Sequence, residues 1–409
     1  MKDFTKISEK GVPDCDKQTQ PVHLLELFGG IGAPRRALEN TFARLIREKN
    51  PDATKKELRS MSSDCIKSID YVEVLPYAVR AYNTMFSLDN RPQDIRLWNL
   101  NVDVLVHGSP CQDFSREGRN DINSGRSILY ERTLQILDPD PDDGPAELRV
   151  RPRICFWENV PNMAYSHPHV LEHYLKTMES YGYTNTFCGS GKYVAKGGYV
   201  SDRSIMVDHM LNASDYGVPQ ARERFFCISV LNELADKHGS FIMPAPIPEN
   251  KRFTLRQFLD LSADMDAKEN QFTDTELSIT KKVGNQWYVR QAVKGDFGAG
   301  PGYVPVNEFQ RVDLAFPNSQ NRRGRVGDYA STLTTSPRQG VLIGDKFRMF
   351  TAKEKLRLMG FRDADYENMV KAGLTDKQIS LLAGNSICVP VLEHIFTAAL
   401  KQYPELYEF

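Results

Sequence analysis

A cysteine follows a short apolar run in the stretch VDVLVHGSPCQDFS, where it stands at position 111. A thiolate is a strong nucleophile, and a cysteine just past a strand lies where α/β sheets place their active sites. An isolated cysteine is more often a small buried residue, which is the competing interpretation. His107 lies upstream in the same run, so a Cys/His hydrolase is a further alternative. The pattern makes Cys111 a candidate nucleophile.

Charged side chains stand at the ends of two other apolar runs. Glu158 closes the run in FWENV and is a candidate general acid where an apolar site raises the pKa of its carboxyl. In QARERFF, Arg222 and Arg224 alternate at the start of a predicted strand, so we expect both on one face. An arginine there can hold a carbonyl oxygen or a phosphate. The ordinary alternatives are a satisfied edge carboxylate and solvated arginines.

A glycine turn, LFGGIG, ends the first apolar run and precedes helical spacing. Such a turn lets the backbone approach a nucleotide-like ligand at a helix N-terminus, although many such turns are purely structural. The spacing of Phe28, Gly30 and Gly32 is shorter than the GxGxxG of pyrophosphate binders, which disfavours NAD. Glu73 ends the next predicted strand, where a carboxylate can accept hydrogen bonds from both ribose hydroxyls. The pattern predicts an adenosyl ligand, with its base near Asp94.

Strands and helices alternate along the chain and must position these groups. The alternation predicts an α/β fold, namely a doubly wound, mostly parallel, Rossmann-like sheet. We expect helices at 76–86 and, with a solvated charged insert, at 41–63. The strands are expected at 22–28, 70–75, near Asp94, and at 102–108, 153–160 and 224–230.

Composition changes after about residue 234, where stretches rich in Pro, Gly and Asn lack helical periodicity. We therefore predict a smaller, irregular, strand-rich domain beyond the sheet. The predicted division is an N-terminal arm at 1–20, a catalytic and cofactor-binding domain at 21–234 completed by helices at about 381–409, the irregular domain at 235–345, and a hinge with a helical return at 346–380. In AGNSI, Asn385 or Ser386 is expected to cap the following helix.

Composition excludes several classes of protein. The chain of 409 residues has a net charge of −1 and no run of about 18 apolar residues, so we expect a protein of the cell interior with no membrane partner. Its seven cysteines are scattered without CxxC spacing, which argues against structural zinc and a disulfide framework. His167, His169 and His173 lack a fourth ligand nearby, so no metal is expected.

Taken together and in this order, the motifs resemble those of the DNA cytosine-5 methyltransferases, over nearly the whole chain. The matching blocks are FxGxG (Phe28, Gly30, Gly32), the acidic residue Glu73, Pro110-Cys111-Gln112, Glu158-Asn159-Val160, QxRxR (Gln220, Arg222, Arg224) and Gly384-Asn385-Ser386. The family binds S-adenosylmethionine and flips its target base out of the duplex. The resemblance implies that Cys111 adds to C6 of cytosine, that Glu158 protonates N3, and that Arg224 and Arg222 hold the O2 side.

The resemblance also implies two sets of binding residues. The cofactor set is Phe28, Gly30, Ile31, Gly32, Glu73, Val74, Asp94, Ile95, Pro110, Leu129, Asn385 and Ser386. The set expected to contact double-stranded DNA is Gln112, Ser115, Arg322, Arg323 and Arg325, the last three in the recognition region at 235–345. Relatives often carry a bulky aromatic residue where this chain has Val74, and the inserts at 41–63 and 138–147 lie outside the family's common core.

Besides the Cys/His hydrolase, three readings of function stay open at this point. The first is a DNA cytosine-5 methyltransferase, expected to be a monomer in the cytoplasm of a bacterial or phage-infected cell. A cognate restriction endonuclease that acts on the same DNA sequence is a possible partner. The second is a transfer-RNA cytosine-5 methyltransferase of the same fold. The third is a catalytically silent DNA-binding relative, which has no chemical need for Cys111, Glu158 and Arg224 together.

Overall fold

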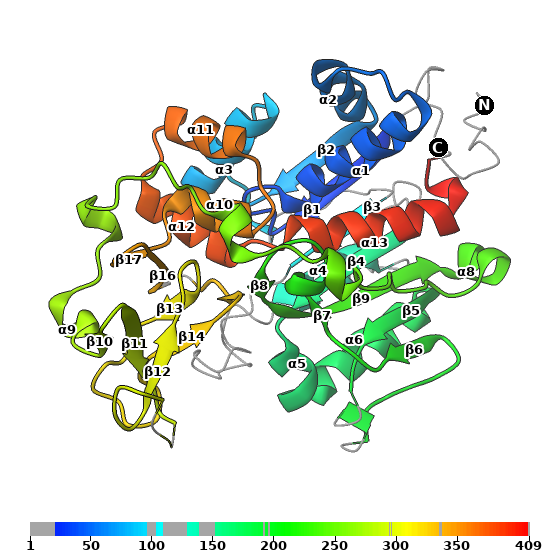
Figure 1. Cartoon of the computed structure of the whole chain (residues 1–409). Coiled ribbons are helices and arrows are strands. Elements are labelled where there is room, and N and C mark those ends of the chain that lie inside the picture. The colour runs from blue at the N-terminus through cyan, green and yellow to red at the C-terminus, as the bar shows by residue number, and fades with distance from the viewer. Residues whose placement is uncertain are drawn as a thin grey trace. The chain divides into compact units, whose positions relative to one another are not determined.

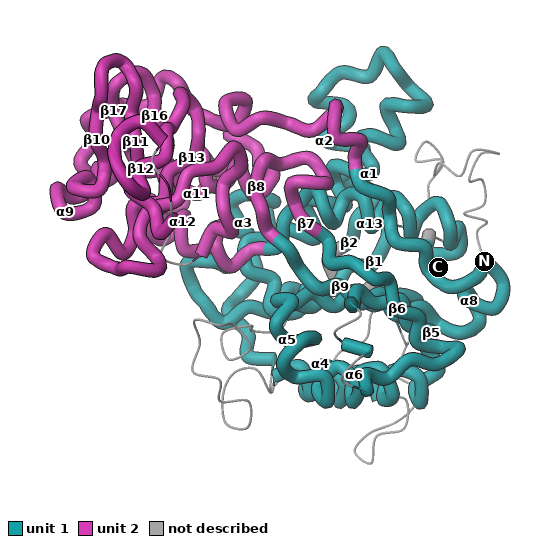
Figure 2. Tube along the Cα trace, turned by 60° about the horizontal axis from the view of Figure 1, so that its bottom comes forward, with its two compact units in different colours: residues 1–211, 223–246, 387–409 teal, residues 212–222, 247–386 magenta. Residues whose placement is uncertain are grey.

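The computed structural model describes residues 21–95, 104–108, 129–138, 152–190, 193–194, 197–293, 295, 297–334 and 338–407. Contacts divide the chain into two compact units, coloured separately in Figure 2. Unit 1 comprises Met1–Leu211, Glu223–Pro246 and Ile387–Phe409, and unit 2 comprises Asn212–Arg222 and Ile247–Ser386. The main segment of unit 2 thus begins at 247, whereas the irregular domain was expected from 235. Unit 2 also includes the residues 346–380, expected as a hinge and helical return, and the short segment 212–222.

Unit 1 is built on a mostly parallel sheet (Figure 1), as the alternation of strands and helices predicts. Its strand order is β2-β1-β3-β4-β9-β5-β6, and β7 pairs with β9 off this path. Neighbours are parallel except that β9 runs antiparallel to both β4 and β5. The strands are β1 (Val22–Leu27), β2 (Ile66–Val72), β3 (Val104–His107), β4 (Ile154–Asn159), β5 (Tyr183–Cys188), β6 (Ser204–Val207), β7 (Leu211–Asn212) and β9 (Glu223–Leu231).

Helices cover this sheet, so its central strands are buried almost throughout, as the continuous apolar runs indicate. Helix α1 packs against α13, α6 packs on β5, and α5 contacts β9. The helices of unit 1 are α1 (Ala33–Lys49), α2 (Lys55–Asp64), α3 (Pro76–Phe86), α4 (Leu129–Leu137), α5 (Pro161–Ser166), α6 (Pro168–Ser180), α8 (Asn232–His238) and α13 (Val389–Gln402).

Unit 2 contains short strands, antiparallel except for the pair β8–β15, and four α-helices in its described part. One sheet has the order β10-β11-β12, another β14-β13-β16-β17, and β15 pairs with β8. The strands are β8 (Gln220–Ala221), β10 (Thr280–Val283), β11 (Gln286–Arg290), β12 (Tyr303–Val306), β13 (Arg311–Asp313), β14 (Arg325–Gly327), β15 (Ala330–Ser331), β16 (Gln339–Ile343) and β17 (Lys346–Met349). The helices are α9 (Asp274–Leu277), α10 (Ala352–Leu358), α11 (Asp363–Lys371) and α12 (Asp376–Asn385).

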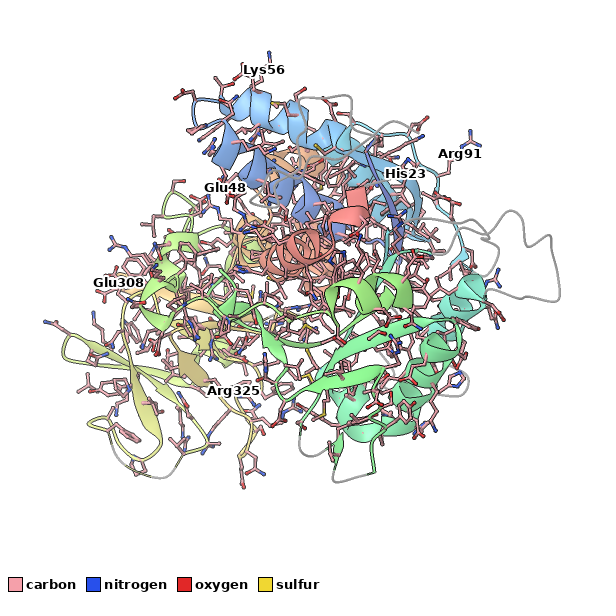
Figure 3. The ribbon with its side chains drawn as sticks, turned by 90° about the vertical axis from the view of Figure 1, so that its right-hand side faces the viewer. His23, Glu48, Lys56, Arg91, Glu308 and Arg325 are labelled. Atoms are coloured by element: carbon pink, nitrogen blue, oxygen red, sulfur yellow. The ribbon has the colours of Figure 1, made fainter. Side chains whose placement is uncertain are left out.

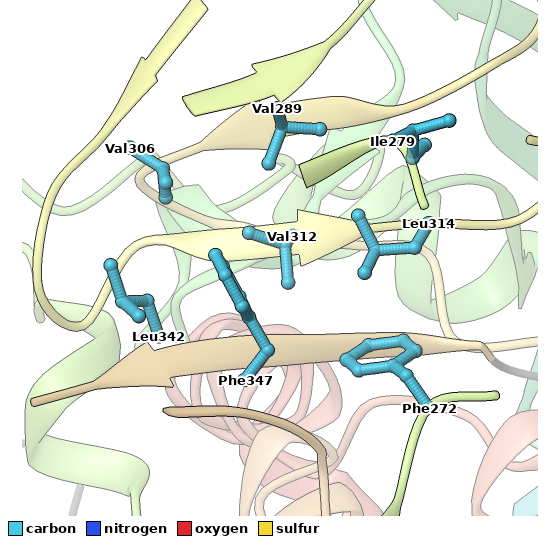
Figure 4. Packing of buried hydrophobic residues seen from close by; sticks show 8 residues of the cluster. All are labelled: Phe272, Ile279, Val289, Val306, Val312, Leu314, Leu342 and Phe347. Atoms are coloured by element: carbon cyan, nitrogen blue, oxygen red, sulfur yellow. The ribbon is translucent and has the colours of Figure 1, made fainter. Parts of the chain in front are cut away.

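A hydrophobic cluster holds the two larger sheets of unit 2 together (Figure 4). Val312 in β13 is fully buried in this cluster. The cluster consists of Phe272, Ile279, Val289, Val306, Val312, Leu314, Leu342 and Phe347. Charged side chains such as Glu48, Lys56, Glu308 and Arg325 are exposed (Figure 3).

Three local expectations differ from the structure. Strand β2 begins at Ile66 and ends at Val72, earlier than 70–75, and the described residues near Asp94 form no strand. The segment 41–63 is not one helix, because α1 ends at Lys49 and Thr54 caps a new helix through a reciprocal pair of hydrogen bonds with Glu57. Ser386 ends α12 as its C-cap, whereas Cys388 precedes α13.

Further findings concern the cysteines, possible metal ligands and apolar helices of the described residues. The five cysteines in the described residues (Cys65, Cys155, Cys188, Cys227 and Cys388) are free and buried, as expected. In the same residues, no group of His, Cys, Asp and Glu is arranged to hold a metal. The segment Asp376–Gln402 is long and apolar enough to cross a membrane by length and composition, but 61% of its apolar window is buried. Core helices commonly have this property, so the segment does not by itself indicate a membrane span.

Candidate active site

The glycine turn after β1 has a backbone that few residues adopt. Phe28 has a φ of 57°, Gly30 of 54° and Gly32 of 72°, and Gly32 is the N-cap of α1. A positive φ in an aromatic residue is strained, and such strain persists where the surrounding structure requires it, commonly at functional sites. Two glycines remove that strain at the neighbouring positions. The turn therefore presents its backbone at the carboxyl end of β1.

The side chains of Tyr71 in β2 and of Glu73 just after β2 bind the backbone carbonyl and N–H groups of Gly30. The Gly30 N–H donates to Glu73 Oε2 at 3.1 Å, and the Tyr71 hydroxyl donates to the Gly30 carbonyl oxygen. Glu73 Oε1 accepts from the Leu75 N–H at 2.9 Å. A Cβ at Gly30 would meet no atom within 4 Å, so one side of the turn is open. An acidic group thus lies beside an approachable backbone.

The other expected cofactor residues of unit 1 connect to this turn through short contacts. The Gln93 N–H donates to the Glu73 carbonyl oxygen at 2.8 Å, which brings Asp94 to the end of β2. Arg132 of α4 donates from Nε to the Ile95 carbonyl oxygen at 3.3 Å, which ties the helix that begins at Leu129 to the same place. Val74 is 60% exposed and Ile31 is buried.

These residues fit an adenosyl ligand. A carboxylate suits the ribose hydroxyls, the glycine turn can approach the ligand closely, and an exposed apolar side chain stands beside Glu73. Pro110 lies outside the described residues. Asn385 and Ser386 belong to unit 2, where Asn385 is exposed and Ser386 is buried.

Glu158 and Arg224 form an ion pair at the ends of β4 and β9. Arg224 Nε lies 3.1 Å from Glu158 Oε1, and the two side chains are 14% and 13% exposed. Arg224 Nη1 donates to the Glu223 carbonyl oxygen at 2.7 Å, and no partner within the described chain uses Nη2. A Cβ at Gly108 would lie 3.5 Å from Glu158 Oε2. The pair therefore stands next to the residue at which the chain leaves β3 for the segment with Cys111.

Cys111 itself lies outside the described residues, as do Gln112 and Ser115. His107, the partner that a Cys/His hydrolase would need, is fully buried at the end of β3. Its Nε2 lies 3.3 Å from the Tyr174 hydroxyl, and its ring stacks on Trp157. Burial lowers the pKa of His107 to about 3, so it binds a proton too weakly to act as a general base near neutral pH.

Arg222 does not share the environment of Arg224, contrary to the expectation from alternation. It lies between β8 and β9, is only 3% exposed, and belongs to unit 2. Its guanidinium donates to the carbonyl oxygens of Leu333 at 2.9 Å, Gly384 at 3.1 Å and Ser386 at 2.8 Å. Gln220 adds hydrogen bonds to Leu333 and Leu358. These contacts hold the end of α12 to the segment after β15, which is a positioning role.

Basic side chains gather in the strands and loops of unit 2. Residues 280–327 contain eight lysines and arginines against three acidic residues, although the whole chain has a net charge of −1. Arg322 is exposed, and its guanidinium lies 4.2 Å from the ring centroid of Phe316. Arg325 is exposed on β14, whereas Arg323 is partly buried and its Nε has no partner in the described chain. A local positive charge of this kind suits a polyanionic partner.

The mostly parallel sheet, the open glycine turn with its acidic neighbour, and the carboxylate–arginine pair at the same strand ends define a Rossmann-like methyltransferase. Residues 22–401 match the sequence profile of the C-5 cytosine-specific DNA methylases, and the chain belongs to that family. It is therefore a DNA cytosine-5 methyltransferase.

Known relatives agree with this assignment over almost their whole length. The chain is 25% identical to "Type II methyltransferase M.HhaI" of Haemophilus parahaemolyticus over 93% of this chain and 94% of the relative. It is 22% identical to "Orphan methyltransferase M.SssI" of Spiroplasma monobiae, covering 93% and 97%. Two solved structures share the fold. They are a putative DNA modification methyltransferase from an Escherichia coli prophage (TM-score 0.56, 17% identity, covering 94% and 100%) and the S. pombe Dnmt2 methyltransferase (TM-score 0.54, 18%, covering 92% and 97%).

Sequence reasoning missed the residues behind the glycine turn. Tyr71, Tyr82 and Glu26 are fully buried and contact the turn or the start of α1. A glutamate inside the apolar run VHLLELF was the available signal, because an unpaired buried carboxylate is costly and implies partners.

Proposed function

We propose that the protein transfers a methyl group from S-adenosylmethionine to C5 of cytosine within a short, specific double-stranded DNA sequence, through a covalent bond between Cys111 and C6. The Glu158–Arg224 pair carries this proposal, because it places a carboxyl group and a cation beside Gly108, the residue that follows β3 and precedes the segment with Cys111. Cytosine C5 is a weak nucleophile, so the reaction needs a group that adds to the ring and a group that stabilises the resulting charge.

The residues of the chain divide this chemistry among them. Glu158, in its protonated form, gives a proton to N3 as the Cys111 thiolate forms a bond to C6 and displaces an electron pair toward N3, and it recovers this proton when the ring is restored. Arg224 keeps Glu158 in place through Nε, and its Nη2 is available to the cytosine O2. When S-adenosylmethionine is bound, it supplies an electrophilic methyl group for C5. Loss of the C5 proton to a base then lets the C6–S bond break, which restores the aromatic ring and frees Cys111.

In this proposal, the turn after β1 and the residues after β2 bind the cofactor. Glu73 binds the ribose hydroxyls, Phe28 packs on the adenine, and Asp94 contacts its amino group. Gly30, Ile31, Gly32, Val74, Ile95, Pro110, Leu129, Asn385 and Ser386 complete the set. The contacts that fix Glu73 to Gly30 and to Gln93 support this part of the proposal.

The target base cannot be attacked inside a stacked duplex, so we propose that it is flipped into the site. Unit 2 recognises the sequence in this proposal, with Arg322, Arg323 and Arg325 on phosphates or base edges and with Gln112 and Ser115 near the flipped base. The basic residues of 280–327 support this role. We also propose that the enzyme acts as a monomer in the cytoplasm of a bacterial or phage-infected cell, alone or beside a restriction endonuclease.

Sequencing of modified DNA tests the proposal directly. The protein is expressed in cells, and plasmid and cellular RNA are read by bisulfite or nanopore sequencing, beside the Cys111→Ser variant. We expect 5-methylcytosine in one short recurring DNA context with wild type and none with the variant. Methylated cytosine found in RNA alone would show that RNA, not DNA, is the substrate. DNA methylation that persists in Cys111→Ser would contradict the covalent step.

A further inference from the structure

Two stacked tyrosines lie directly behind the glycine turn. The rings of Tyr71 on β2 and Tyr82 on α3 are 3.8 Å apart between centroids and inclined by 18°, and both are fully buried. A Cβ at Gly29 would come within 2.5 Å of the Tyr71 ring, and one at Gly32 within 2.5 Å of the Tyr82 ring. The rings therefore fill the space that side chains at these two positions would need. The tyrosines therefore require glycine at positions 29 and 32, and the positive φ of Gly32 favours glycine there as well.

Both hydroxyls of the stack bind groups that define the turn. The Tyr71 hydroxyl donates to the Gly30 carbonyl oxygen, and the Tyr82 hydroxyl donates to Glu26 Oε2 at 2.5 Å. Glu26, fully buried on β1, also accepts the Arg35 N–H of the first turn of α1 at 3.2 Å through Oε1. Burial raises the pKa of Tyr71 far above its usual value, so this hydroxyl keeps its proton and remains a donor.

We propose that Tyr71, Tyr82 and Glu26 are positioning residues that hold the turn Phe28–Gly32 in the conformation that binds the S-adenosyl ligand. This inference rests on the proposed function, because it takes the open side of Gly30 as the ligand's side. The turn is strained at Phe28, and a strained segment stays in one conformation only when its surroundings fix it. A turn fixed before the ligand arrives loses less conformational entropy on binding, which raises affinity.

The carboxyl group of Glu26 gives this arrangement a dependence on pH. The charged and titratable groups that face it are Tyr82 from α3, Arg35 and Glu39 from α1, and Tyr71 from β2. Burial raises the pKa of Glu26 to about 7 against the opposing effects of Tyr82 and Arg35. The carboxylate accepts both hydrogen bonds, whereas the protonated form must donate one of its own. We therefore expect tighter ligand binding at pH 8 than at pH 6.

Calorimetric binding of S-adenosylhomocysteine to the full-length protein tests the positioning role without turnover. Tyr71→Phe and Tyr82→Phe keep the stacked rings and remove one hydroxyl each. We expect about 5- to 10-fold weaker binding for each, as one buried hydrogen bond implies. Tyr183→Phe is the matched control, because Tyr183 is fully buried in β5 and its hydroxyl donates to the Pro152 carbonyl oxygen at 2.8 Å. Its dissociation constant should stay within about twofold of wild type.

A pH series separates positioning from general stability. Wild type should bind more tightly as pH rises from 6 to 8, and Glu26→Gln should lose that dependence while it keeps a folded thermal transition. Equal weakening by Tyr183→Phe and Tyr71→Phe would overturn the inference, as would an unchanged pH dependence in Glu26→Gln. Wild-type protein that binds no S-adenosyl ligand would instead refute the proposed cofactor, so the two failures are distinguishable.

Discussion

Replacement of Glu158 by glutamine separates the chemical role of this carboxyl from its structural role. The amide oxygen of Gln can still lie against the Arg224 Nε–H, so the substitution removes only the ability of the group to ionise and to carry a proton. The ion pair is 3.1 Å long with side chains 14% and 13% exposed, between the surface and buried cases, so its loss should cost about 1–2 kcal/mol of unfolding free energy. General acid catalysis contributes about 10²- to 10⁴-fold, or about 3–5 kcal/mol of transition-state stabilisation. The effect on kcat should therefore exceed the effect on stability.

Steady-state transfer of labelled methyl groups to a DNA duplex measures kcat and KM, and calorimetry measures S-adenosylhomocysteine binding and the melting temperature. Glu405→Gln is the control for loss of an ion-paired carboxylate, since Glu405 is 15% exposed and pairs with His238 at 2.8 Å and with Lys237, elsewhere in unit 1. We expect a similar loss of stability in both variants but a fall in kcat of at least 100-fold only in Glu158→Gln. A kcat for Glu158→Gln within tenfold of wild type would refute the assignment of Glu158 as the acid.

Three further outcomes follow from the described contacts. Arg222→Ala removes a cation from three buried carbonyl groups, so urea denaturation should show a loss of about 3–5 kcal/mol, and a loss below about 1 kcal/mol would contradict the positioning role. Burial raises the pKa of Glu26 from 4.5 to about 7, so the folded state binds the extra proton and wild-type stability falls as pH rises through that window. Glu26→Gln should lack this part of the decline in unfolding free energy. If the plots of unfolding free energy against pH ran parallel for wild type and Glu26→Gln, Glu26 would not be the group that titrates. Arg325→Ala should weaken DNA binding and lower the slope of log K against log salt by about one, whereas an unchanged slope would place Arg325 away from phosphates.

The sequence was sufficient to predict elements that are determined by residues close together in the chain. Helix α3 begins at Pro76 and ends at Phe86 as its periodicity predicts, because a proline at its start and a regular apolar face define it. A glycine turn at Phe28–Gly32 is expected from the sequence, and Gly30 and Gly32 adopt positive φ values there. Glu158 and Asn159 are the last two residues of their strand, as expected. In each case the residues that determine the conformation lie next to one another in the chain.

Features that depend on distant partners were not predictable in the same way. Strand β2 begins at Ile66, before its apolar run, because it pairs in parallel with β1 from Val22 onward. The glutamate, the Arg35 backbone N–H and the two tyrosines behind the glycine turn come from β1, α1, β2 and α3, and no local sequence pattern predicts such a combination. Arg222 and Arg224 are two residues apart, yet their partners are α12 and β4, which lie far from them in the chain.

The direction of β9 explains why an arginine from this part of the chain can meet Glu158 at all. Active groups of a parallel sheet gather at the carboxyl ends of its strands, so a parallel β9 would begin at the opposite edge and carry Arg224 away from them. Strand β9 instead runs antiparallel to β4, with Phe226 opposite Glu158 and Phe225 opposite Asn159. Its first residues therefore lie at the carboxyl end of β4. A charged motif at the start of this strand reaches the same edge as the glycine turn and Gly108, which is why one antiparallel strand is part of the site and not an irregularity of the sheet.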